Sequence, residues 1–159
     1  KKLTEAKREE WFAKMRKWKK EGKIDFAVSL VSSQFIDRHG IAPAIRKGIA
    51  NVLRKLGANP RSVLVLLDGG IKAPEVFTAQ KTIIKGDEKE PVIALASIAA
   101  KVTRDQRMKH LAKVHDKHGF EVHKGYGTAI HYARIKKWGM TAIHRRTFLK
   151  NIKVKEKNQ

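Results

Sequence analysis

Five consecutive apolar residues at 63–67 constrain the fold more than any other stretch of this chain. They are followed by Asp68 and two glycines. An apolar run without alternation predicts a strand that is buried on both faces. A second strand is expected in TAQKTIIKGD, which ends at Asp87. Segments with helical periodicity alternate with these strands, and this alternation indicates an α/β fold.

Cap residues and apolar spacing place the other elements. Asp37 or the turn at Gly40 is expected to start the second helix. The expected elements are a helix from Thr4 to Gly22, a strand at 25–31, a helix that Gly57 ends, a long helix from Pro91 to Gly119, and a helix from about Thr128 to Trp138.

The charge balance indicates a nucleic-acid partner. The chain of 159 residues has 36 Lys and Arg against 15 Asp and Glu, for a formal net charge of +21. Clustered basic residues neutralise phosphates and release counterions. A merely soluble basic surface is the alternative, and an anionic membrane is a weaker one. The absence of cysteine excludes disulfides and thiolate metal sites, and it fits a reducing, cytoplasmic setting.

Asp68 and Asp87 are the clearest candidates for chemistry. Each follows an apolar strand and adjoins a glycine. Sites in open α/β sheets form beyond the carboxyl ends of strands. Oxygen ligands suit Mg²⁺, and a divalent cation beside nucleic acid suggests phosphodiester chemistry. The alternative is that both aspartates only cap turns or helices.

The histidines fit no metal-binding spacing. Four of them, His110, His115, His118 and His123, lie close in the sequence but match no zinc pattern. We interpret them as part of a solvated basic face. The chain also has no nucleophile-elbow motif and no glycine-rich nucleotide loop.

The loop EVHKGYGT presents Tyr126 between Gly125 and Gly127. A ring framed by two glycines fits presentation to a flat or sugar-like partner, whereas packing does not need glycine on both sides. An exposed loop tyrosine without a function is the alternative.

Seven stretches in order resemble ribonuclease HII, the type 2 ribonuclease H family, over residues 1 to 148. They are KKLTEAKREE, IDRHGIAPAI, VLLDGG, IIKGD, ASIAAKVTRDQRM, GFEVHKGYGT and GMTAIHRRTF. The resemblance implies an RNase H-like mixed sheet flanked by helices. It also implies an Mg²⁺- or Mn²⁺-dependent endonuclease that cuts RNA in RNA–DNA hybrids, including single ribonucleotides in duplex DNA.

The resemblance assigns roles to individual residues. Asp68 and Asp87 match two of the family's four metal-binding carboxylates, and they would be the catalytic metal ligands. Tyr126 matches the family tyrosine that packs against the sugar next to the scissile position. Asp105 lies in a family signature, but we expect it to pair with an arginine. The expected substrate contacts are Tyr126, Lys124, Gly125, Gly127, Lys1, Lys2, His144 and Arg145. Arg146 is a further basic candidate, and for the three residues 144–146 surface solvation is an equal alternative.

The sequence departs from the family in one respect. The family's other two carboxylates are an Asp-Glu pair before Gly-Arg-Gly, and nothing here precedes the stretch at Lys1. We expect a domain at 1–148 that is truncated at its N-terminus and lacks the first two central strands, with a polar basic tail at 149–159. The chain alone should then bind metal weakly and cleave poorly or not at all.

Two further hypotheses fit the composition. One is a non-catalytic basic protein that binds nucleic acid, and the other is a structural protein of a ribonucleoprotein particle. Acids at Asp68 and Asp87 favour the enzyme, because they would repel phosphate in a pure binder. As an enzyme, the protein is expected to be a monomer with RNA–DNA hybrid and ribonucleotide-containing duplex as partners, and with no membrane.

Overall fold

The computed structural model describes residues 3–152, which contain seven α-helices and two strands. The α/β class is therefore confirmed. The chain divides into two compact units. Unit 1 comprises the residues up to 31 and 41–102, and unit 2 comprises 32–40 and the residues from 103 onward. Within the described range, no helix is long and apolar enough to cross a membrane.

The first core of unit 1 forms between α1 (Glu5–Lys20) and α5 (Pro91–Val114). The Thr4 side chain caps α1 by accepting a hydrogen bond from the Lys7 amide, as the sequence predicts. Phe12 and Met15 then fall on one face of the helix and are buried. They pack against Ile98, Ala99 and Val102 of α5.

Residues 25–31 do not form the expected strand, and this prediction is wrong. The segment is extended but pairs with no strand in the described part of the chain. Lysine side chains take the place of a neighbouring strand: Lys19 donates to the Phe26 carbonyl at 2.9 Å, and Lys55 donates to the Val28 carbonyl at 2.8 Å. The Phe26 ring packs on Phe12, with 5.6 Å between centroids.

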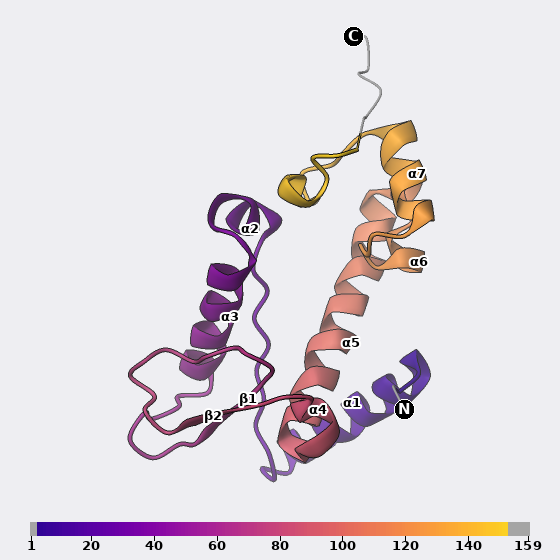
Figure 1. Ribbon diagram of the computed structural model, residues 1–159. Helices are drawn as coiled ribbons and strands as arrows, with labels where there is room; N and C mark the ends of the chain where they lie inside the picture. The colour runs from indigo at the N-terminus through magenta and orange to yellow at the C-terminus, as the bar shows by residue number, and fades with distance from the viewer. Residues whose placement is uncertain (1–2, 153–159) are drawn as a thin grey trace. The chain divides into compact units, whose positions relative to one another are not determined.

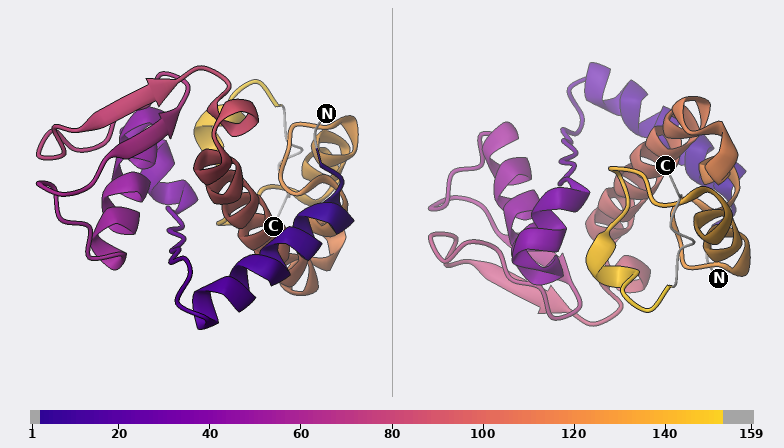
Figure 2. Two further views of the ribbon diagram at one scale, coloured as in Figure 1. Left: turned by 90° about the horizontal axis from the view of Figure 1, so that it is seen from below. Right: turned by 90° about the horizontal axis from the view of Figure 1, so that it is seen from above.

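A parallel two-stranded sheet forms the second part of unit 1. Strand β1 (Val65–Asp68) pairs with β2 (Gln80–Ile83), and Asp68 is in register with Ile83. Helix α3 (Ile41–Lys55) lies across one face of the sheet (Figure 2), where Ile49 and Leu53 pack on a cluster that contains Leu67. The prediction of burial on both faces is wrong, because Leu64 is 63% exposed and only Leu67 of the run is fully buried.

Unit 2 contains a helix that the sequence analysis missed. Helix α2 (Ser33–His39) is capped by Ser32, and Gly40 separates it from α3. Asp37 therefore lies inside a helix instead of starting one. Its carboxylate accepts hydrogen bonds from the backbone of Arg146 and from the backbone and hydroxyl of Thr147. These bonds tie α2 to the 3₁₀ turn η2 (Arg146–Phe148). Leu149, which was expected to begin the tail, is buried.

The rest of unit 2 folds back along the C-terminal half of α5 (Figure 1). Helix α5 ends at Val114, before the expected Gly119, and the turn η1 (Asp116–His118) follows. Next come α6 (Phe120–His123) and α7 (Ala129–Trp138), with Thr128 and Gly139 at the ends of α7 as expected. Phe120 and Ile135 form the centre of this unit, with 1% and 0% exposure.

Candidate functional site

Asp68 lies at the carboxyl end of β1, at the sheet edge where β2 also ends. After β2 the chain turns at Lys85, which has a left-handed backbone (φ 55°), and enters the short helix α4 (Gly86–Lys89). The backbone amide of Gly86 donates to Oδ1 of Asp68 at 2.8 Å. The next residue is Asp87. The hydrogen bond therefore holds the backbone beside Asp87 against Asp68, at the edge where both strands end.

Gly86 makes this approach possible, and sequence reasoning did not single it out. It is buried, and a Cβ there would lie 2.7 Å from Ile93 Cδ1 and 3.5 Å from Asp68 Oδ1. No larger residue fits without moving its neighbours. The signal in the sequence was a glycine directly before an aspartate at a strand end, where close backbone approach is common.

The prediction that the second strand ends at Asp87 is wrong, because β2 ends at Ile83. Asp87 lies instead in the first turn of α4 and is partly exposed. Its Oδ2 is 3.9 Å from the ammonium of Lys101 on α5, which is a long and partly exposed ion pair. Such a pair contributes little stability, so it leaves the carboxylate available for another cation.

The donor set at this edge fits a hard divalent cation. It consists of two carboxylates, and Mg²⁺ is often bound through one or two carboxylates together with water and substrate phosphates. Among residues 3–152, no three His, Asp or Glu side chains are grouped closely enough to hold a metal ion by themselves. Any ion at Asp68 and Asp87 would thus need further oxygen ligands from water or substrate.

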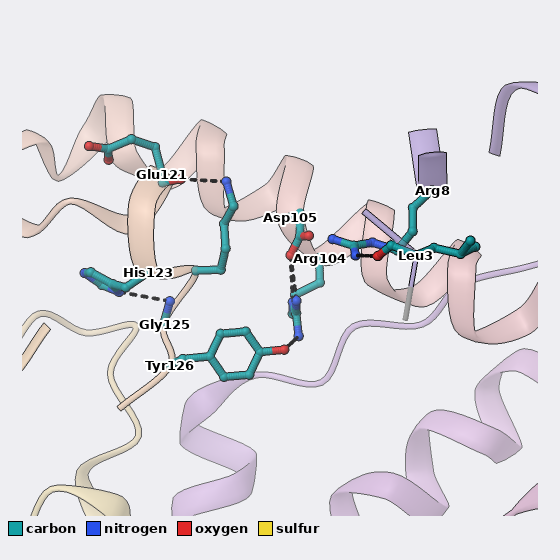
Figure 3. Close-up of polar contacts among 9 residues, drawn as sticks. Leu3, Arg8, Arg104, Asp105, Glu121, His123, Gly125 and Tyr126 are labelled. Carbon is teal, nitrogen blue, oxygen red and sulfur yellow. Dashed lines mark hydrogen bonds and ion pairs between the residues drawn. The ribbon is translucent and has the colours of Figure 1, made fainter. Parts of the chain in front are cut away.

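Tyr126 belongs to unit 2, in the loop between α6 and α7, and its side chain is 55% exposed. Figure 3 shows its hydroxyl directed at Arg104 of α5, which donates to it through Nη1. The Arg104 guanidinium carbon is 4.7 Å from the ring centroid. Arg104 in turn pairs with the buried Asp105, which confirms the ion pair expected there.

The glycines beside Tyr126 have separate structural roles. Gly125 has φ 78°, which favours glycine. A Cβ on Gly127 would collide with the Tyr132 hydroxyl, so the space there is filled by the protein itself. Lys124 also has a left-handed backbone (φ 50°), and its ammonium donates to the Glu121 carbonyl at 2.6 Å.

A chain of histidines supports this loop from inside unit 2. The Thr141 amide donates to Nδ1 of His144 at 2.8 Å, so the proton of His144 lies on Nε2. That proton faces Nε2 of His131 at 3.2 Å. His131 can then donate from Nδ1 to the Tyr126 carbonyl at 2.9 Å. When His144 and His131 are both neutral, each of their ring nitrogens has a hydrogen-bond partner of the right kind, donor to acceptor.

His123 supports the same loop. Its Nδ1 accepts from the Gly125 amide at 3.1 Å, and its Nε2 donates to the His118 carbonyl at 2.7 Å. Its ring stacks on His131 with 4.0 Å between centroids. We call the four buried rings around Phe120 the histidine stack: His118, His123, His131 and His144.

Burial lowers the pKa of two histidines of the stack, His131 and His144. Burial, and then the nearby His131 and His118, lower the pKa of His144 to about 4. Burial also lowers the pKa of His131. The prediction of a solvated basic face is therefore wrong for His118 and His123. His144, an expected substrate contact, is 5% exposed, and its lowered pKa keeps it neutral at pH 7. Local spacing carried no signal for this burial.

The remaining predicted contacts are less defined. The Arg145 guanidinium carbon is 4.3 Å from the Phe148 ring centroid, and the Arg146 backbone bonds to Asp37. Lys1 and Lys2 lie outside the described residues. The acids Asp68 and Asp87 are in unit 1, and the Tyr126 loop is in unit 2.

Known proteins share the pattern of this chain over most of its length. The family model described as Ribonuclease HII matches residues 1–151. A ribonuclease HII of Clostridioides difficile (strain 630) is 41% identical over 152 residues, which cover 96% of this chain and 57% of that protein. One of Ruminiclostridium cellulolyticum is 38% identical over 95% of this chain and 56% of that protein. One of Fusobacterium nucleatum is 41% identical over 96% of this chain and 70% of that protein.

The chain thus spans a little over half the length of the first two of these relatives. The similarity extends through the strand-end acids and the Tyr126 loop. This chain belongs to the ribonuclease HII family.

Proposed function

We propose that the protein in which this chain occurs hydrolyses the RNA strand of RNA–DNA hybrids. It cuts on the 5′ side of ribonucleotides, including single ribonucleotides in duplex DNA. Membership of the ribonuclease HII family supports the reaction class. The observation that carries the proposal is the bond from the Gly86 amide to Asp68, which holds the residue next to Asp87 against Asp68 in a chain of net charge +21.

Asp68 and Asp87 would hold the divalent cation, Mg²⁺ or Mn²⁺. When bound, the cation lowers the pKa of water and offsets the negative charge of the phosphate. The water oxygen forms the new bond to phosphorus while the bond from phosphorus to the 3′ oxygen breaks. The products then carry a 3′-hydroxyl and a 5′-phosphate. The Gly86 amide fixes the orientation of Asp68, so the carboxylate is aligned before substrate arrives.

Substrate recognition would fall to the Tyr126 loop and to basic side chains. The exposed ring of Tyr126 can pack on a sugar face, and the 2′-hydroxyl is what distinguishes ribose from deoxyribose. Gly125 permits the backbone turn that presents the ring. Lys124, Arg145, Lys1 and Lys2 would meet phosphates, which position a duplex without reading its sequence.

The second candidate function is binding of nucleic acid without cleavage, and the net charge of +21 supports it equally well. The two functions differ in what they require of the acids. Asp68 and Asp87 would weaken binding to phosphate, so a pure binder gains from their removal. An enzyme loses its activity when either is removed.

The test compares cleavage with binding in the full-length protein. A labelled hybrid is incubated with Mg²⁺ or Mn²⁺ and wild type, Asp68→Asn or Glu75→Gln. Glu75→Gln is the matched control, because it also replaces one exposed acid of unit 1 by its amide. We expect Asp68→Asn to lower cleavage at least about 100-fold while binding persists. Binding without cleavage by the wild type would favour the non-catalytic protein.

A further inference from the structure

Arg104 makes two separate contacts with the exposed Tyr126 side chain. Its Nη1 donates to the Tyr126 hydroxyl, and its guanidinium carbon is 4.7 Å from the ring centroid. The first contact is a hydrogen bond and the second is a cation–π contact. The two residues are 22 positions apart in the sequence, so the contact joins α5 to the loop between α6 and α7 (Figure 3).

Asp105 fixes the other side of the same guanidinium. Its Oδ1 accepts from Nε of Arg104 at 3.0 Å and from Nη2 at 2.7 Å. Asp105 is 3% exposed, so its charge is held at one place inside unit 2. The guanidinium is planar and its donors are in a fixed fork. With Nε and Nη2 bound to Asp105, Nη1 is left directed at the tyrosine.

The backbone of Tyr126 is fixed independently of Arg104. Its amide donates to the His123 carbonyl at 2.8 Å. Its carbonyl accepts from the Thr128 amide at 2.8 Å and from Nδ1 of His131 at 2.9 Å. The backbone thus sets where the ring starts, but an exposed side chain still turns about its own torsions. Arg104 is the group that holds the far end of the ring.

We propose that Arg104, held by Asp105, is the positioning residue that orients the Tyr126 ring for packing against a nucleic-acid sugar. This inference rests on the proposed function, because it gives that ring its task. A ring that is fixed before binding loses less conformational entropy when the substrate binds than a ring that rotates freely. Loss of Arg104 should therefore weaken recognition of the ribose junction while leaving the acids of unit 1 in place.

The first arm of the test needs no nucleic acid. The chain has two tyrosines, Tyr126 and Tyr132, so ¹³C labelling of tyrosine rings gives two sets of NMR signals, which Tyr132→Phe assigns. We expect Arg104→Gln to shift the Tyr126 ring signals and leave those of Tyr132 in place. Arg107→Gln is the matched control, because it removes the same charge from an exposed site on α5. Unchanged Tyr126 signals in Arg104→Gln would overturn the proposal.

The second arm measures incision of a duplex with one ribonucleotide by the full-length protein. Tyr126→Phe keeps the ring and removes only the hydroxyl that accepts from Arg104, so this variant also serves if Arg104→Gln does not fold. We expect each variant to raise KM about tenfold, from the loss of one charge-assisted hydrogen bond. The variant that combines Arg104→Gln with Tyr126→Phe should raise KM no more than either single substitution. Arg104→Lys should recover part of the loss, because lysine keeps a donor without the fork.

Additive losses in the double variant, or a fall in kcat with KM unchanged, would overturn the positioning role. The two arms separate this inference from the proposed function. If wild type does not cleave at all, the proposed function fails, and the NMR arm still decides whether Arg104 orients the ring.

Discussion

Acid should destabilise unit 2 because the buried His144 and His131 both have lowered pKa values. His144 accepts from the Thr141 amide through Nδ1. A second proton on that nitrogen would place two donors face to face. It would also put a charge among the buried rings of His131 and His118, with His115 close enough to repel it. The folded state therefore resists protonation, whereas the unfolded chain does not.

The magnitude follows from the pKa of His144. It is about 4 in the fold and 6.5 in its ordinary state, a difference that corresponds to about 3 kcal/mol. Because the folded pKa is lowered, this stability is present in full above pH 6.5. It is lost as the pH falls from 6.5 towards 4. The pKa of His131 is lowered as well, so it contributes in the same direction.

The assay is urea unfolding between pH 7 and pH 4.5, followed by fluorescence of Trp138. Trp11 and Trp18 are replaced by Phe, so that the signal reports unit 2. The free energy of unfolding of wild type should fall steeply over this range. In His144→Gln the slope of this free energy against pH should be smaller, by an amount that corresponds to close to one proton taken up on unfolding. His110→Gln, which changes an exposed histidine, should leave the slope unchanged. Equal slopes in His144→Gln and wild type would refute the reasoning.

Two further predictions concern the sheet edge and the charge. Gly86→Ala should cost about 1 kcal/mol, because its Cβ would displace Cδ1 of the buried Ile93. Thermal unfolding measures this cost, and an unchanged Tm would contradict the close packing. Affinity for a hybrid should fall at least about tenfold between 50 and 200 mM salt, since the net charge is +21; an affinity measured by anisotropy that stays constant across salt would contradict phosphate binding.

Local signals in the sequence predicted the helix ends well. Thr4 and Thr128 each cap a helix through an amide three residues later, and Gly139 ends one. These interactions depend on residues within a single turn. The strand-end position of Asp68 was also predictable, because parallel strands end together. Asp87 does not end a strand, because β2 stops at Ile83 and Asp87 lies in α4.

Signals that depend on distant partners were missed. Residues 25–31 have the composition of a strand, but lysine side chains satisfy the Phe26 and Val28 carbonyls instead. The histidines are polar in any local window, yet Phe120 and the neighbouring rings bury four of them. The Arg104 contact with Tyr126 joins positions 22 residues apart, and periodicity on α5 did not indicate it.

The most direct test of the account is the rate of hybrid cleavage by the full-length protein as the Mg²⁺ or Mn²⁺ concentration rises. We predict that the wild-type rate rises with metal to a plateau and that the products carry 3′-hydroxyl and 5′-phosphate ends. Asp87→Asn should lower the plateau at least about 100-fold. Cleavage that needs no metal, or that survives Asp87→Asn at the wild-type rate, would contradict the assignment of Asp68 and Asp87.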